Sequence, residues 1–265
     1  MKTRVLAALV LVPLLFVVFL FVPIWITAVV VGIMCAGASY ELLHNTRLVT
    51  SKRINTYTSV LAFGVSMWCF WGCSAIYGLL GILLLYVLVF AEVMTSRLKV
   101  QSKDILLCAF AGFMVPYMLS ALVRIVMMEQ GRAYIFIPFL VAFLSDTGGY
   151  FAGVCFGRHK LAPVISPKKT VEGFIGGVVA SIIGMVIFKL ITGDLVSWEF
   201  AIFMGLIGSL GGVFGDLSMS AIKRQTGIKD FGRLIPGHGG ILDRFDSVLV
   251  TAPLTELVLM LFVMV

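Results

Sequence analysis

The chain has 265 residues, of which 60% are hydrophobic and only 12% are charged. This composition excludes a soluble globular protein and is typical of a polytopic membrane protein, because about 20 consecutive apolar residues cross a bilayer as a helix. The formal net charge of +7 does not indicate a nucleic-acid partner, since no soluble domain is left to present a basic face.

The apolar runs predict an all-α fold with nine transmembrane helices. The first run, from Val5 to Ser39, is too long for a signal peptide, and Pro23 divides it into two helices. Five spans belong to an N-terminal region, residues 1–130. Four belong to a C-terminal region, residues 131–265, with polar loops at 156–173 and 219–246. The predicted spans are 5–21, 24–43, 57–71, 74–94, 105–127, 133–155, 174–192, 198–218 and 247–265.

The basic residues predict the orientation of these spans. With the N-terminus in the cytoplasm, all but three of the 20 Lys and Arg residues fall on the cytoplasmic side; the exceptions are Arg124, Arg132 and Lys189. Cytoplasmic loops carry such an excess of Lys and Arg. We therefore expect the C-terminus outside and both polar loops on the cytoplasmic face.

Acidic residues at the ends of the predicted spans indicate a cation site. Glu41, Asp146 and Asp216 lie at or inside span ends, where a carboxylate is costly unless it is paired or bound to a cation. Asp243 and Asp246 are three residues apart and would share one helix face if the last helix begins there. Three converging carboxylates, Asp216, Asp243 and Asp246, would suit Mg²⁺.

An ion-pair network is the alternative interpretation of these carboxylates. It would pair them with nearby arginines instead of a metal, namely with Arg224, Arg233 and Arg244. A solvated cytoplasmic loop that only orients the protein is the simplest interpretation of the whole segment from Ser220 to Asp246.

The loop at 156–173 supplies the opposite charge. Ser166-Pro167-Lys168-Lys169-Thr170 precedes the start of a predicted helix. Lysines, hydroxyl groups and the free N–H groups of a helix N-terminus together favour bound phosphate. Thr170 is alternatively the cap of that helix, and the two lysines are alternatively charges that only orient the chain.

Carboxylate-bound metal beside clustered Lys and Arg is typical of phosphoryl or nucleotidyl transfer. At a membrane face it implies one lipid and one water-soluble substrate. An ion-coupled transporter would instead need charges near the bilayer midplane and inverted repeats. A CDP-alcohol phosphatidyltransferase would need an Asp-Gly-x2-Ala-Arg motif, which the sequence lacks.

The segment from Ser220 to Asp246 resembles the signature of the phosphatidate cytidylyltransferases, the CDP-diacylglycerol synthases. A second similar block runs from Ser145 to Gly173, with Gly149 where many members have Ala, whereas the N-terminal third is similar only in hydropathy. The signature positions are Ser220-x2-Lys223-Arg224-x4-Lys229-Asp230-x-Gly232-x2-Ile235-Pro236-x-His238-Gly239-Gly240-Ile241-x-Asp243-Arg244-Phe245-Asp246.

The resemblance implies that CTP and phosphatidate give CDP-diacylglycerol and pyrophosphate in a multi-pass homodimer of the inner (cytoplasmic) membrane. It implies Mg²⁺ on Asp216 and Asp243 with support from Asp246, and a second, monovalent cation such as K⁺. Lys169 and Lys223 join these aspartates as catalytic residues. The implied substrate-binding residues are Asp146, Ser166, Lys168, Lys169, Thr170, Glu172, Lys223, Arg224, Lys229, Asp230, His238 and Arg244.

Overall fold

The structure, a computed structural model, describes residues 13–95, 101–232, 234 and 239–263. The chain divides into two compact units. The first unit comprises Met1–Arg132 and Thr226–Arg244, and the second comprises Ala133–Gln225 and Phe245–Val265. These units differ from the two predicted regions, 1–130 and 131–265, because residues 226–244 belong to the first unit.

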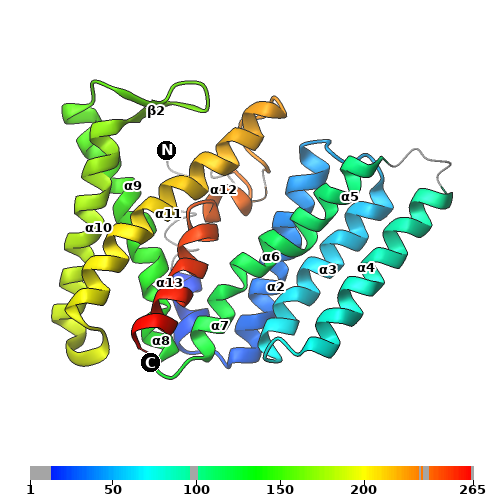
Figure 1. The fold of residues 1–265 in the computed structure, drawn as a ribbon, viewed down its shortest axis with the longest axis horizontal. Coiled ribbons are helices and arrows are strands. Elements are labelled where there is room, and N and C mark those ends of the chain that lie inside the picture. Colours follow the sequence, from blue (N-terminus) through cyan, green and yellow to red (C-terminus); the bar gives the residue numbers. More distant parts are fainter. Residues whose placement is uncertain (1–12, 96–100, 233, 235–238, 264–265) are drawn as a thin grey trace. The chain divides into compact units, whose positions relative to one another are not determined.

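The first unit is helical. Helix α2 packs against α3, and α3 packs against α4 (Figure 1). A π-helical turn, Glu41–Asn45, continues α2 and brings that apolar span to Asn45. The helices are α2 (Ile24–Tyr40), α3 (Lys52–Phe70), α4 (Ala75–Thr95), α5 (Ser102–Ala109), α6 (Val115–Leu119) and α7 (Ala121–Met127), with a second π-helical turn at Phe110–Met114 and the short α12 (Leu242–Phe245).

Two helices of this unit differ from the prediction in their details. Helix α3 begins at Lys52, five residues before the predicted start, because Ser51 caps it by accepting the N–H of Ile54 at 3.5 Å. The predicted span 105–127 is one apolar stretch, Lys103–Met127, that bends through the π-helical turn and a break at Ser120.

In the second unit, α10 packs against both α9 and α11 (Figure 1). Small residues bring α9 and α10 close together: a Cβ added to Gly148 would collide with Ala180, and one added to Gly176 would collide with Ala152. The elements are α8 (Gly131–Tyr134), which leads into this unit, α9 (Phe136–Phe156), β1 (Lys160–Ala162), β2 (Ser166–Thr170), α10 (Val171–Thr192), a 3₁₀ turn (Gly193–Leu195), α11 (Trp198–Gln225) and α13 (Val248–Phe262).

A two-stranded antiparallel hairpin replaces most of the loop predicted at 156–173. Strand β1 pairs with β2, with Lys160 opposite Thr170 and Ala162 opposite Ser166. Helix α10 follows β2 directly and begins at Val171, because the Thr170 hydroxyl accepts the N–H of Gly173 at 3.1 Å. The structure thus confirms the alternative role of Thr170 as a helix cap.

Two predictions about the C-terminal segment were wrong. Helix α11 continues to Gln225 instead of ending at 218, so Ser220, Lys223 and Arg224 are helical. Asp243 lies in α12, whereas Asp246 lies in the turn before α13, so the two carboxylates do not share a helix face.

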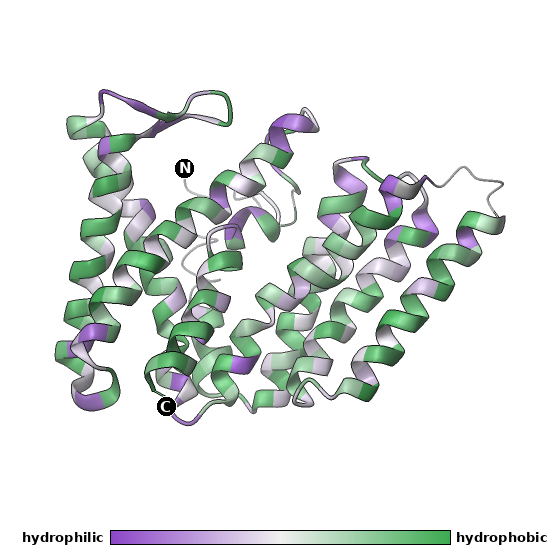
Figure 2. Cartoon of the chain, viewed as in Figure 1, coloured by the Kyte–Doolittle hydropathy of each residue, from purple (hydrophilic) through white to green (hydrophobic). Residues whose placement is uncertain are grey.

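Within the described part of the chain, six helices are long and apolar enough to cross a membrane. Figure 2 shows hydrophobic residues along most of the length of helices such as α4 and α10. Two other predicted spans fall short of this measure, because α3 is more polar and α13 has 15 residues. Of the predicted span 5–21, residues 13–20 are helical and residues 5–12 lie outside the described part of the chain. The chain is a predominantly helical, polytopic membrane protein.

Candidate active site

Asp216 is the centre of a charged cluster in the second unit. It lies on α11, and its carboxylate contacts the ammonium group of Lys169, which comes from the end of β2. The Ser220 hydroxyl, one turn further along α11, donates to Asp216 Oδ1 at 3.2 Å. The hairpin and α11 therefore meet through an ion pair between Lys169, predicted in a loop, and Asp216, predicted at the end of a span.

A second ion pair extends this cluster. Lys223 Nζ lies 3.9 Å from Asp246 Oδ2, and both side chains are largely buried, at 11% and 16% exposure. The backbone N–H of Ser247 donates to Asp246 Oδ1 at 2.9 Å, and the Ser247 hydroxyl donates to Asp146 Oδ2 on α9 at 3.4 Å. We call the five charged residues the Asp–Lys cluster: Asp146, Lys169, Asp216, Lys223 and Asp246.

The cluster carries more acid than its lysines neutralise. Burial and, to a smaller extent, the neighbouring charges of Asp216 and Asp146 raise the pKa of Asp246 to about 7, against the opposing effect of Lys223. When Asp246 is deprotonated, three carboxylates facing two ammonium groups leave a net negative charge. Such a group of carboxylates attracts a further cation.

A close backbone approach fixes the position of Asp246. A Cβ added to Gly215 on α11 would lie 2.5 Å from the carbonyl oxygen of Asp246, so only glycine lets the turn reach the helix. Gly211 and Gly215 both face α13 or the turn before it, so the close packing of α11 with α13 also serves the site.

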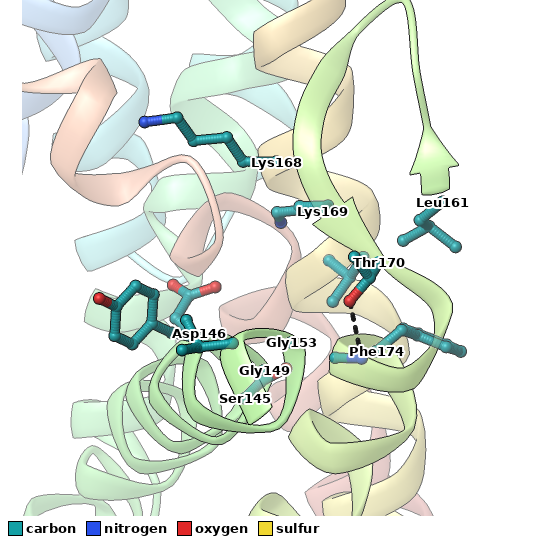
Figure 3. Close-up of a pocket in the computed structure, with 13 residues that line it drawn as sticks. Ser145, Asp146, Gly149, Gly153, Leu161, Lys168, Lys169, Thr170 and Phe174 are labelled. Carbon is teal, nitrogen blue, oxygen red and sulfur yellow. Dashed lines mark hydrogen bonds between the residues drawn. The ribbon is translucent and has the colours of Figure 1, made fainter. Parts of the chain in front are cut away.

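A cavity of about 330 Å³ adjoins the cluster. Its walls include Tyr150, Val154 and Phe174, and its polar lining includes Asp146, Lys168 and Lys169. Figure 3 shows the two lysines projecting from β2 on the side where the Asp146 carboxylate of α9 lies. The cavity therefore combines apolar walls with positive charge from one strand.

Two predicted substrate residues hold the hairpin in place. Arg224 Nε donates to the carbonyl oxygen of Ile165 at 3.2 Å, which ties the turn of the hairpin to α11. Glu172 accepts the backbone N–H groups of Arg158, at 3.0 Å, and His159, at 3.2 Å, and also contacts the His159 ring at 2.6 Å. Both side chains position the strand that carries Lys168 and Lys169.

The glycine-rich part of the signature belongs to the first unit, where Asp243 organises it. Asp243 is 6% exposed, and its Oδ2 accepts the backbone N–H groups of Phe231 at 2.8 Å, Gly240 at 3.0 Å and Gly232 at 3.4 Å. One carboxylate oxygen thus ties together segments on either side of residues 233–238. This role was not predicted, because it depends on how the loop folds back on itself.

The remaining predicted residues have different surroundings. Lys229 and Asp230 are exposed and line a cavity of about 580 Å³ in the first unit, beside Asn45 and Phe231. Arg244 is exposed on α12 and Ser166 is half-buried in β2. His238, like Arg233, lies outside the described residues. Ser247 was missed, although it directly follows the signature aspartate.

Mg²⁺ requires hard oxygen donors. In the described residues, no three His, Cys, Asp or Glu side chains stand ready to hold a metal ion. In the second unit, however, Asp146, Asp216 and Asp246 supply hard oxygen donors whose present partners are two lysines and two serines. This chemistry fits Mg²⁺, which binds carboxylates together with waters and substrate phosphates.

Comparison with known proteins gives a family and several relatives. The model of the cytidylyltransferase family matches residues 2–262. A phosphatidate cytidylyltransferase of Staphylococcus saprophyticus is 46% identical over 131 residues, which are 49% of this chain and 50% of the relative. One of Staphylococcus aureus is 48% identical over 134 residues, again 49% and 50% of the two chains. The chain therefore spans about half the length of the curated relatives it matches.

Proposed function

The chain belongs to the cytidylyltransferase family, and we propose that it transfers a cytidylyl group from CTP to phosphatidate, giving CDP-diacylglycerol and pyrophosphate. The relatives that it resembles carry the name of this activity. The observation that carries the proposal is the Asp–Lys cluster with an apolar-walled cavity beside it. A nucleotide triphosphate requires the charges, and a lipid requires the apolar walls.

In the proposed reaction, a phosphate oxygen of phosphatidate attacks the α-phosphorus of CTP. The bond from that phosphorus to the oxygen of the β-phosphate breaks, and pyrophosphate leaves. The attacking phosphate monoester is largely ionised at neutral pH, so the protein does not need a general base for this step. Its task is to position two anions and to neutralise them.

Lys168 and Lys169 are suited to the lipid phosphate, because they line the cavity whose walls are apolar. Lys223 is suited to the triphosphate, since it is buried beside Asp246 and its charge is shielded little by water. In the family pattern these basic residues share the two substrates with Arg224 and Lys229. Arg224 also holds the hairpin, so its loss would weaken the site indirectly.

Asp216 and Asp246 are the proposed Mg²⁺ ligands of the second unit, and Asp146 lies beside them. A monovalent cation such as K⁺ is the proposed second ion. Held by these residues, Mg²⁺ would supply positive charge to neutralise the charge that develops on phosphate during transfer. Asp243 also remains a predicted ligand. Its Oδ2 accepts three backbone N–H groups, so its removal would disturb the loop as well.

The proposed setting is the inner (cytoplasmic) membrane. Nine spans, a cytoplasmic N-terminus and an external C-terminus would bring the loops at 156–173 and 219–246 to the cytoplasm, where CTP is found. The distribution of Lys and Arg supports this orientation. We propose a homodimer, which the close-packing glycines of the helices permit.

Transfer of label from CTP into lipid tests the proposal. CTP labelled in the cytosine ring is incubated with purified protein, Mg²⁺ and either phosphatidate or diacylglycerol, and the lipid is extracted. We expect label in the lipid only with phosphatidate, because diacylglycerol lacks the attacking phosphate. Label with diacylglycerol, or none with phosphatidate, would contradict the proposed reaction.

A further inference from the structure

The Glu41 carboxylate, on the π-helical turn that ends α2, contacts a segment some 200 residues away in sequence. Glu41 Oε1 accepts the backbone N–H of Ile241 at 3.0 Å, and Oε2 accepts that of Leu242 at 3.0 Å. Glu41 is 4% exposed and both N–H groups are buried. Because each carboxylate oxygen of Glu41 accepts one of these N–H groups, the side chain holds the two amides in one fixed arrangement.

The same turn makes a second contact with this segment. Asn45 Nδ2 donates to the carbonyl oxygen of Phe231 at 2.7 Å. The π-helical turn, Glu41–Asn45, therefore holds both ends of the glycine-rich segment, at Phe231 and at Ile241–Leu242. Such π-helical turns recur at functional sites because they re-aim side chains within a helix.

The glycines of the segment make room for the carboxylate. A Cβ added to Gly232 or Gly240 would collide with the Glu41 carboxylate oxygens. Asp243 accepts the N–H groups of these two glycines and of Phe231 from the other side. Two buried carboxylates from distant parts of the chain thus share the backbone donors of one loop.

We infer that Glu41 is a positioning residue for the signature segment: by holding the amides of Ile241 and Leu242, it fixes Asp243 and the neighbouring loop in the arrangement used for catalysis. The role in turnover rests on the proposed function, whereas the contact itself does not. Glu41 lies far from the signature in sequence. Among the described residues of the signature it accepts the backbone N–H groups of Ile241 and Leu242, so it acts through the loop.

The test is a Glu41→Gln variant, measured by hydrogen exchange and by kinetics on the full-length protein in detergent. Glutamine keeps one acceptor oxygen and presents an NH₂ group to the other backbone donor. Amides of peptides covering Ile241 and Leu242 should exchange at least about tenfold faster, because one buried N–H loses its acceptor. Peptides of α10 should exchange as in the wild type.

Kinetics provide the second readout. Turnover should fall by about 100-fold, with KM for CTP and phosphatidate changing much less, because a displaced catalytic loop costs rate more than substrate binding. The matched control is Glu92→Gln, the same chemical change at a carboxylate near Arg53 and Ser51. It should leave both the exchange of the signature amides and the turnover unchanged.

Each outcome decides the inference. Unchanged exchange at Ile241 and Leu242 would overturn it, whatever the turnover. Faster exchange with wild-type turnover would leave the contact but overturn the positioning role. Should Glu41→Gln fail to fold, Gly240→Ala tests the same contact from the loop side. If the wild type shows no turnover with CTP and phosphatidate, the proposed function fails, while the exchange experiment still decides whether Glu41 holds the loop.

Discussion

At the scale of single residues, charge compensation organises the candidate site. Lys169 and Lys223 each face an aspartate of the second unit, and serine hydroxyls occupy further carboxylate oxygens. Pairs of this kind are costly to break on one side only, because the remaining charge is then buried without a partner. Substitution of one member therefore tests both the electrostatics and the chemistry.

Lys169→Met should lower turnover by about 100-fold or more, because the variant loses a positive charge that is already in place to stabilise a substrate phosphate. The variant removes the ammonium group beside Asp216 and beside the cavity. The control is Lys160→Met, an exposed lysine on the same hairpin. Steady-state rates with CTP and phosphatidate measure the effect; equal rates for Lys169→Met and the wild type would make Lys169 an orienting charge only.

Asp246 should make stability depend on pH. Its pKa of about 7 in the folded protein lies above the ordinary value of 3.8, so the folded state holds a proton that the unfolded state releases. Stability without metal should therefore fall as the pH rises towards 7 and level off above it. Asp246→Asn should lack this fall, so its unfolding midpoint should change less between pH 5 and pH 8 than that of the wild type.

Thermal unfolding in detergent with a chelator, from pH 5 to pH 8, measures this difference. Replacing the chelator with Mg²⁺ should raise the midpoint of the wild type more at pH 8 than at pH 6, because protons and metal compete for the same carboxylate. If the unfolding midpoints of the wild type and Asp246→Asn change with pH in parallel without Mg²⁺, Asp246 does not have the raised pKa. If they also change in parallel with Mg²⁺, Asp246 is not a ligand of the metal.

At the scale of elements, Gly215 of α11 lets this helix pack closely against α13 and the turn that holds Asp246. Gly215→Ala should displace the turn at Asp246, since the added Cβ would lie 2.5 Å from its carbonyl oxygen. Overpacking of this kind costs about 1–3 kcal/mol. We expect a lower unfolding midpoint together with reduced turnover.

The matched control is Gly64→Ala in α3, where an added Cβ meets nothing within 4 Å. Alanine there should be neutral or slightly stabilising, because glycine is a poor helix former. If both alanine variants behave alike in unfolding and turnover, the close approach at Gly215 is unimportant to the site.

Hydropathy predicted most of the helices, because each needs about 20 apolar residues to cross a bilayer. Hydropathy placed the end of α11 too early, because the apolar residues stop before the helix does: α11 continues through Ser220, Lys223 and Arg224 to Gln225. It also could not reveal the β1–β2 hairpin, whose strands have three and five residues within a polar segment.

The candidate site was predictable as a set of residues but not as an arrangement. The pairing of Lys169 with Asp216 follows from the hairpin, which the sequence analysis treated as a loop. The helix face proposed for Asp243 and Asp246 was wrong, because α12 ends at Phe245. The contact of Glu41 with Ile241 and Leu242 bridges 200 residues, and no local pattern indicates it.

At the scale of the whole molecule, the proposed orientation is open to direct test. A phosphatase that is active only outside the cytoplasm should be active when fused after the C-terminal residue, and inactive when inserted between β1 and β2. A fluorescent reporter that matures only in the cytoplasm should give the opposite result. Phosphatase activity at the hairpin would contradict the proposed topology, because the hairpin would then lie on the side of the membrane away from the CTP of the cytoplasm.

The measurement that tests the central claim most directly is pyrophosphate release by the purified protein. CTP, phosphatidate and Mg²⁺ are supplied together and then omitted one at a time, for the wild type and for Asp216→Asn. We predict release that requires all three components and falls at least about 100-fold in the variant, which keeps the shape of the carboxylate but loses its charge. Release without phosphatidate, or equal release by Asp216→Asn, would contradict cytidylyl transfer at the Asp–Lys cluster.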